Sequence, residues 1–246
     1  MPSRDFRTPR LVIDAELTAG AEIALGREQT NYVRNVLRLP AGATLLVFNG
    51  RDGEWRGRLQ EAGRREVRLL VEAQSRAQTS AGVLDYAFAP LKHARLDYMV
   101  QKAVEMGATT LTPVMTRHTQ VTRVNLERMR ANAIEAAEQC GILSLPAVAQ
   151  PIAFEHWLAA LDPGRVVIFC DEESESRDPL EALKRAPQGP PTLLVGPEGG
   201  FEESERRALL LRERVVRLSL GPRILRADTA AVAALALVQA ALGDWH

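Results

Sequence analysis

Two short apolar runs, each leading directly into a glycine-proline loop, most constrain what this chain can fold into. Residues 192–195 (TLLV) lead into residues 196–201 (GPEGGF), and residues 215–220 (VVRLSL) lead into Gly221-Pro222. Near-continuous apolar runs of this length are typical of strands buried on both faces of a parallel sheet. Ligands of such sheets bind beyond the carboxyl ends of the strands. The two loops therefore predict a binding site made largely of backbone groups, which glycines leave accessible.

The first third of the chain has a different pattern, with short alternating runs separated by turn signals. These runs predict five strands, at residues 11–13, 21–25, 44–48, 55–59 and 67–71. The dipeptides Asn49-Gly50 and Asp52-Gly53 favour a hairpin between the third and fourth of them. Residues 28–39 are the exception, because their apolar positions have helical spacing before Pro40 ends the pattern. Five short strands with tight turns predict a small β-barrel.

A small, polar segment at about residues 75–82 separates this pattern from strands that alternate with amphipathic helices. We therefore expect two domains, residues 1–76 and residues 83–246, the second an α/β domain with a parallel sheet. Its remaining elements are predicted to be strands at 84–90, 111–115 and 166–170 and helices near 96–104, 126–140 and 202–212. The last helix, 229–242, is apolar nearly all round. This predicts burial, either in the domain core or against another subunit.

Composition narrows the classes of protein. The chain of 246 residues has no apolar run of the roughly 20 residues needed to cross a membrane, and no hydrophobic signal core near its start. We expect a cytoplasmic protein in which Cys140 and Cys170 are buried, reduced thiols. The net charge is zero, yet 28 of the 31 basic residues are arginines and residues 1–76 carry a net charge of +3. This suggests either contact with phosphate through the first domain or the codon usage of a GC-rich genome.

The absence of several sequence motifs disfavours some classes of nucleotide-binding and metal-binding protein. The sequence has neither a GxxxxGK[ST] motif nor an early GxGxxG, HExxH or paired-cysteine pattern, so we expect no bound metal. The four histidines, at positions 93, 118, 156 and 246, are scattered, and each is expected to be a surface or structural residue. Such a chain suits a reaction whose reactivity resides in a cofactor. Arg226 could neutralise an anionic reacting group or be an ordinary surface arginine, and Asp228 or Thr229 could cap the last helix.

Five segments together resemble the ribosomal small-subunit methyltransferase E group of the SPOUT superfamily. They are residues 193–201 (LLVGPEGGF), 218–230 (LSLGPRILRADTA), 101–107 (QKAVEMG), 134–141 (IEAAEQCG) and 35–38 (NVLR). The first two are the specific ones. The resemblance implies methylation of N3 of a uridine in 16S rRNA of the 30S subunit, with S-adenosylmethionine as donor and S-adenosylhomocysteine as product. It also implies a PUA-like RNA-binding barrel, a deep trefoil knot in the α/β domain, and a homodimer with sites at the subunit interface.

The resemblance also implies the residues of the site. The cofactor would be held by Leu194, Val195, Gly196, Glu198, Gly199, Gly200, Leu218, Leu220, Gly221, Ile224, Leu225, Thr229 and Ala230. Because uridine N3 reacts as its anion, Arg226 is the candidate cation that stabilises it. Glu198 is either the base that removes the proton or a residue that holds its loop closed by accepting backbone N–H bonds. Arg7, Arg10, Arg34 and Arg38 are candidates for phosphate contacts.

The sequence departs from the family pattern at three places. Residues 227–230 are Ala-Asp-Thr-Ala where family members commonly have Thr-Glu-Thr-Ala, Ile142 replaces a basic residue, and Tyr32 stands where a histidine is usual. The last two concern RNA contacts more than catalysis. Two alternatives stay open. One is a SPOUT enzyme acting on a ribose 2′-hydroxyl or a tRNA base, and the other is a non-catalytic RNA-binding or ribosome assembly protein.

Overall fold

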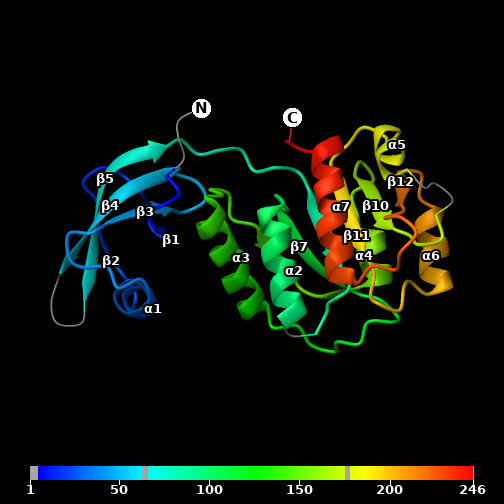
Figure 1. Ribbon diagram of the computed structural model, residues 1–246, viewed down its shortest axis with the longest axis horizontal. Coiled ribbons are helices and arrows are strands. Elements are labelled where there is room, and N and C mark those ends of the chain that lie inside the picture. Colours follow the sequence, from blue (N-terminus) through cyan, green and yellow to red (C-terminus); the bar gives the residue numbers. More distant parts are fainter. Residues whose placement is uncertain (1–4, 62–65, 93, 175–177, 246) are drawn as a thin grey trace. The chain divides into compact units, whose positions relative to one another are not determined.

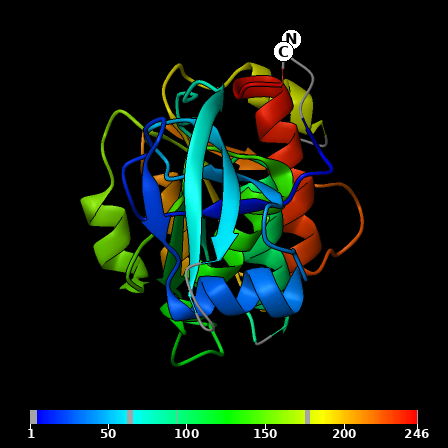
Figure 2. The same cartoon turned by 90° about the vertical axis from the view of Figure 1, so that its left-hand side faces the viewer.

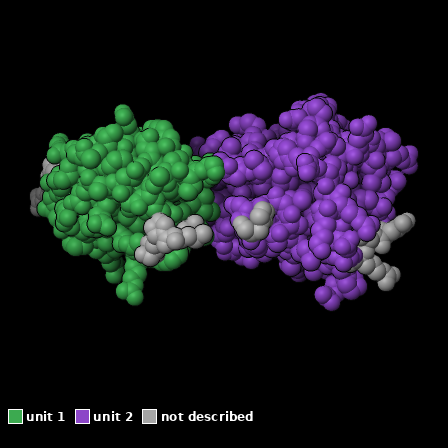
Figure 3. All heavy atoms as spheres, turned by 90° about the horizontal axis from the view of Figure 1, so that it is seen from above, with its two compact units in different colours: residues 1–80, 137–145 green, residues 81–136, 146–246 purple. Residues whose placement is uncertain are grey.

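The computed structural model describes residues 5–61, 66–92, 94–174 and 178–245. The chain divides into two compact units, coloured separately in Figure 3. The first comprises residues 1–80 and 137–145, and the second comprises residues 81–136 and 146–246. In the described ranges no helix is both long and apolar enough to cross a membrane.

The first unit is built on one five-stranded sheet with the order β1-β3-β4-β5-β2. Its strands are β1 (Arg10–Val12), β2 (Glu22–Ala24), β3 (Thr44–Phe48), β4 (Glu54–Glu61) and β5 (Val67–Arg76), which are blue to cyan in Figure 2. The five predicted strands are therefore confirmed. Only β1 and β3 run parallel. Among the described residues, no hydrogen-bonded ladder joins the two edge strands, β1 and β2. The hydrogen bonds of the five strands therefore define a curled open sheet rather than a closed barrel.

The helix predicted over residues 28–39 is present, but its second half is wider than an α-helix. It consists of α1 (Arg27–Asn31) and a π-helical turn, η1 (Tyr32–Val36). The wider turn is closed by the backbone N–H of Leu37, which donates to the carbonyl of Tyr32 at 2.9 Å. Arg38 then takes a left-handed conformation, with φ 53°, and the helix ends before Pro40 as predicted.

A buried carboxylate holds the first unit together. Glu54 on β4 accepts hydrogen bonds from Arg10 Nε at 2.9 Å, Arg76 Nη2 at 2.7 Å and Ser75 Oγ at 2.8 Å. Arg76 also donates to the carbonyl of Gly141 at 3.0 Å. The side chains of Glu54 and Arg10 are only 3% and 4% exposed. Arg10, predicted to contact phosphate, is instead buried and paired with Glu54, so its guanidinium is not available to RNA.

The second unit contains a seven-stranded sheet in which every recorded pairing is parallel. Its main path is β12-β10-β11-β6-β7-β8, with β9 also paired to β7. The strands are β6 (Asp85–Phe88), β7 (Thr110–Met115), β8 (Ala147–Val148), β9 (Ile152–Ala153), β10 (Val166–Cys170), β11 (Pro191–Val195) and β12 (Val215–Leu218). The predicted parallel sheet is confirmed. Only β8 and β9, of two residues each, were not predicted, and the trefoil knot stays a prediction.

Six helices accompany this sheet in the described residues (Figure 1). They are α2 (Ala94–Glu105), α3 (Leu126–Cys140), α4 (Phe154–Ala160), α5 (Pro179–Lys184), α6 (Glu203–Leu210) and α7 (Ala227–Leu242). Gly107 and Gly141 follow α2 and α3 with φ of 83° and 63°, the left-handed conformation that glycine adopts at helix ends. Asn125 caps α3 as predicted, because its Oδ1 accepts from the backbone N–H of Arg128 at 3.0 Å. The short helices α4 and α5 were not predicted.

The start of α7 differs from the prediction. Its N-cap is Arg226, and neither Asp228 nor Thr229 fills that position. The helix begins two residues earlier, since the backbone N–H of Ala230 already donates to the carbonyl of Arg226 at 2.8 Å. One face of α7 packs on α2, α5 and β11, as predicted for a core helix. A second apolar strip is only half-buried, and it consists of Val232, Ala233, Ala236 and Leu237.

Candidate functional site

The parallel sheet brings the two glycine loops to one edge. Strands β11 and β12 both pair with β10, so their carboxyl ends lie on either side of the end of β10. The loops that follow them enclose a cavity of about 340 Å³, which we call the loop cavity. This volume is within the roughly 300–1,000 Å³ of small-molecule sites.

Most of the residues predicted to bind a cofactor line the loop cavity. They are Val195, Gly196, Glu198, Gly199, Gly200, Leu218, Leu220, Gly221, Ile224, Leu225 and Ala230. Two predicted residues are not in its lining. Leu194 is fully buried in the sheet core with Phe169, and Thr229 is exposed on the first turn of α7.

The end of β10 supplies a third wall that sequence reasoning missed. Cys170, Asp171, Glu172 and Glu173 line the loop cavity there. Asp171 is 5% exposed and accepts from Arg217 Nε at 2.6 Å and Arg206 Nη2 at 3.2 Å. The acidic run directly after an apolar strand was the available signal, since it lies at the same sheet edge as the two loops.

Cys140 and Cys170, predicted to be buried, are both only half-buried. The sulfur of Cys170 is nevertheless desolvated enough to be a poor acid. Burial, with a smaller contribution from the charge of Asp171, raises the pKa of Cys170 to about 12. The thiol is therefore protonated near neutral pH. It offers the cavity a neutral, weakly polar surface rather than a nucleophile.

Aromatic packing determines the path of the loop after β11. A Cβ added to Gly196 would lie 2.8 Å from Cε2 of Phe201. The ring of Phe201 in turn contacts Phe169 and Phe154, with centroid distances of 5.9 and 6.2 Å. Gly200 adopts φ 70°, which favours glycine. Backbone groups of the loop thus line the loop cavity. Side chains at these glycines would leave less room in it for a ligand.

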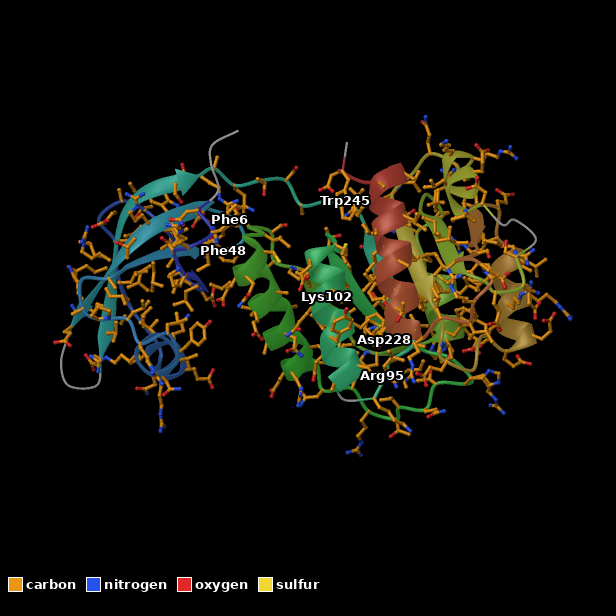
Figure 4. The ribbon with its side chains drawn as sticks, in the orientation of Figure 1. Phe6, Phe48, Arg95, Lys102, Asp228 and Trp245 are labelled. Atoms are coloured by element: carbon orange, nitrogen blue, oxygen red, sulfur yellow. The ribbon has the colours of Figure 1, made fainter. Side chains whose placement is uncertain are left out.

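Two side chains from outside the loop hold its tip. Arg95, labelled in the first turn of α2 in Figure 4, is ion-paired with the carboxylate of Glu198. His118 Nδ1 lies 3.1 and 3.2 Å from the carbonyl oxygens of Gly199 and Gly200. Because carbonyls only accept, this nitrogen carries the proton whenever those bonds form. His118 is exposed, as predicted. The recorded partner of Glu198 is a guanidinium rather than a backbone N–H.

A second cavity, of about 370 Å³, also contacts the loop after β11. We call it the basic cavity, because Lys92, Arg95 and His118 line it. Its other lining residues are Pro90, Leu91, Gln120, Val121, Pro197, Glu198 and Gly199. The last three also line the loop cavity, so the two cavities share a wall.

The remaining candidates lie elsewhere. Arg226 is exposed, and it is absent from the lining of both cavities. In the first unit, Arg7 and Arg38 are exposed, while Arg34 is half-buried and donates to the carbonyl of Glu66 at 3.3 Å. Among the described residues no group of three or more His, Cys, Asp or Glu side chains is placed to hold a metal ion.

Comparisons with known proteins cover both units. Residues 78–239 match the family model of an RNA methyltransferase domain, and residues 25–72 match that of an RNA methyltransferase PUA domain. A ribosomal RNA small subunit methyltransferase E of Rickettsia conorii is 31% identical, over 94% of each chain. The solved enzyme of that name from Neisseria gonorrhoeae, bound to S-adenosyl methionine, superposes with TM-score 0.87 and 26% identity over 98% of this chain and 100% of its own. A Legionella pneumophila protein with bound SAM superposes with TM-score 0.82 and 28% identity. The match covers 96% of this chain and 98% of the Legionella chain.

Proposed function

Because this chain belongs to the ribosomal RNA small subunit methyltransferase E family of RNA methyltransferases, we propose that it methylates N3 of a specific uridine in 16S rRNA. It is an S-adenosylmethionine-dependent rRNA methyltransferase with an N-terminal PUA domain. The observation that carries the proposal is the loop cavity, which lies between two glycine loops at the carboxyl edge of the sheet.

The residues of the loop cavity fit S-adenosylmethionine. Leu218, Leu220 and Ile224 supply apolar surface for a purine ring, and backbone groups at the loop glycines can meet its polar edge. The carboxylates of Glu172 and Glu173 add negative charge near the place of a sulfonium and an ammonium group. We propose that the predicted residues lining this cavity bind the cofactor. Leu194 supports them from the core, and Thr229 does so from α7.

When bound, the cofactor supplies a methyl group on a positively charged sulfur, so the protein must mainly align and activate the nucleophile. The N3–H bond of uridine breaks, its electron pair forms the bond to the methyl carbon, and the carbon–sulfur bond breaks to leave S-adenosylhomocysteine. Glu198 lines both cavities and is the proposed proton acceptor. Arg226, directly before the cavity residue Ala227, is proposed to stabilise the uridinate.

The target uridine must be unpaired or flipped out, because base pairing hides N3. We propose that Arg7, Arg34 and Arg38 of the first unit contact RNA phosphates. In the structure Arg7 and Arg38 are exposed. The 30S subunit or its free 16S rRNA is the proposed partner, and the cytoplasm the proposed location.

We further propose that the chain forms a homodimer through the half-buried apolar strip of α7. Light scattering on the purified protein tests this directly. Leu237→Glu places a charge in the strip, so this variant should be monomeric. Leu180→Glu, at an exposed position of α5, is the control and should leave the dimer intact.

The decisive experiment incubates the protein and labelled S-adenosylmethionine with 30S subunits and separately with naked 16S rRNA, both lacking the modification. A third reaction contains tRNA. Mass spectrometry of the nucleosides should show 3-methyluridine. Methylation of a ribose 2′-hydroxyl or of tRNA would favour the first alternative. Cofactor and RNA binding without transfer to any of these RNAs would favour a non-catalytic RNA-binding protein.

A further inference from the structure

The basic cavity is lined by an exposed lysine for which no ion pair with a described residue is recorded. Its two cations are Lys92, just before α2, and Arg95 in the first turn of that helix. The charge of Arg95 is compensated by its ion pair with Glu198. No hydrogen bond or ion pair of the Lys92 ammonium is recorded among the described residues. A cavity with one uncompensated ammonium favours an anionic occupant.

The position of this cavity limits what the occupant can be. It shares Pro197, Glu198 and Gly199 with the loop cavity, so the two cavities adjoin at one loop. Methyl transfer requires the acceptor atom to lie in line with the donor, at roughly 3–3.5 Å from the reacting carbon. The acceptor must therefore occupy space that adjoins the cofactor site. The basic cavity meets that requirement.

We propose that the basic cavity receives the unpaired target nucleotide of the RNA and that Lys92 binds an anionic oxygen of that nucleotide. This inference rests on the proposed function and adds the place of the substrate. The cavity volume of about 370 Å³ is that of a small-molecule site. Leu91, Val121 and Pro90 offer apolar surface to a base, and the Gln120 amide can pair with a base edge. Arg95 keeps the shared wall in place through Glu198.

The chain has three lysines, which allows a matched test. Lys92→Met should lower kcat/KM for the RNA substrate about tenfold or more, the effect of losing a charged hydrogen bond. Its dissociation constant for S-adenosylmethionine, measured by calorimetry, should stay within about twofold of the wild type. Lys184→Met is the control, since Lys184 lies on α5, is 70% exposed and lines neither cavity. It should leave both values unchanged.

A second measurement does not depend on turnover. The wild-type protein is acetylated with an amine-selective reagent, with and without unmodified 16S rRNA and S-adenosylhomocysteine, and each lysine is followed by mass spectrometry. Bound RNA should protect Lys92 and leave Lys184 reactive. Equal acetylation of Lys92 with and without RNA, or unchanged kcat/KM in Lys92→Met, would overturn the inference. Weakened cofactor binding in that variant would instead assign the cavity to the cofactor.

The outcomes separate this inference from the proposed function. If the wild-type protein forms no 3-methyluridine on either substrate, the proposed function fails. If it forms 3-methyluridine and Lys92→Met behaves like Lys184→Met, the function stands and the substrate pocket is wrong.

Discussion

The guanidinium of Arg95 in the first turn of α2 is ion-paired with the carboxylate of Glu198, 103 residues later in the loop after β11. The pair forms part of the wall between the loop cavity and the basic cavity. Its side chains are 41% and 47% exposed, so water screens their attraction. Exposed pairs of this kind stabilise a fold by about 0–1 kcal/mol. The pair therefore orients Glu198 more than it stabilises the domain.

This arrangement predicts different effects for the two partners. Glu198→Gln should lower kcat by about 100-fold or more, because it removes the proposed proton acceptor. Arg95→Gln should weaken cofactor binding by no more than about fivefold, the equivalent of one exposed pair. Single-turnover rates and calorimetry measure the two effects. A Glu198→Gln enzyme with nearly wild-type kcat would show that the carboxylate only positions the loop.

Arg226 is tested in the same assay. Arg226→Ala should reduce kcat on the order of 100-fold if its charge stabilises the uridinate, with cofactor affinity preserved. Arg185→Ala at the end of α5, where the side chain is 82% exposed, serves as the control. Because Arg226 lines neither cavity, an unchanged kcat would remove it from the mechanism. The cations that do line the two cavities, Arg206, Arg223, Lys92 and Arg95, would then be the candidates.

Two glycines of one loop should differ in their tolerance of a methyl group. A Cβ at Gly196 would meet the Phe201 ring at 2.8 Å, whereas one at Gly199 would lie 3.4 Å from Cβ of His118. Since the Phe201 ring is packed against two other rings, we expect Gly196→Ala to displace the loop. Its affinity for S-adenosylmethionine should fall about tenfold or more below that of Gly199→Ala. Equal affinities would mean that the ring yields easily.

The first unit should be sensitive to the loss of Glu54. Glu54→Gln leaves Arg10 and Arg76 without a carboxylate, and breaking a buried pair in this way typically costs about 3–5 kcal/mol. Glu72→Gln, which removes the exposed pair with Arg58, should cost no more than about 1 kcal/mol. Chemical denaturation of both variants at pH 7 measures the difference. Similar losses would show that the burial of the pair has no special importance.

Acid should weaken the same contact. Burial alone would raise the pKa of Glu54, but hydrogen bonds from Arg76, Ser75 and Arg10 outweigh it and hold that pKa below its usual 4.5. The contribution to stability is therefore complete above pH 4.5 and is lost as the pH falls through the lowered pKa. The free energy of unfolding should decline below that pH, and more steeply in the wild type than in Glu54→Gln. Parallel declines would contradict this assignment.

The thiol of Cys170 should be inert. With the pKa raised from 9.0 to about 12, its thiolate is on the order of 1,000-fold scarcer at pH 8 than in an ordinary cysteine. In a Cys140→Ser protein, iodoacetamide should label the remaining thiol very slowly. Saturating S-adenosylmethionine should slow labelling further, because Cys170 lines the loop cavity. Rapid alkylation would show that the β10 end is more open to water.

Local sequence patterns were sufficient to predict most helices and strands and two walls of the loop cavity. The apolar runs before Gly196 and Gly221 predicted β11 and β12, because a strand buried on both faces must be apolar along its length. The five strands of the first unit follow in the same way from alternation and turn residues. The short elements β8, β9, α4 and α5 could not be found, since they are too brief to show a period and depend on contacts with distant strands.

Only the tertiary structure decided which distant residues meet. Placing β10 between β11 and β12 brought the acidic run after Cys170 into the loop cavity, and no local signal encodes that strand order. The same packing placed Lys92 and Arg95 beside the tip of a loop some hundred residues later, and buried Arg10 against Glu54. The sequence by itself determined the longer elements and the glycine loops, since backbone propensity and hydrophobic periodicity act over a few residues. Charge pairing and shared cavity walls depend on the packing of segments far apart in the chain, and so only the fold could decide them.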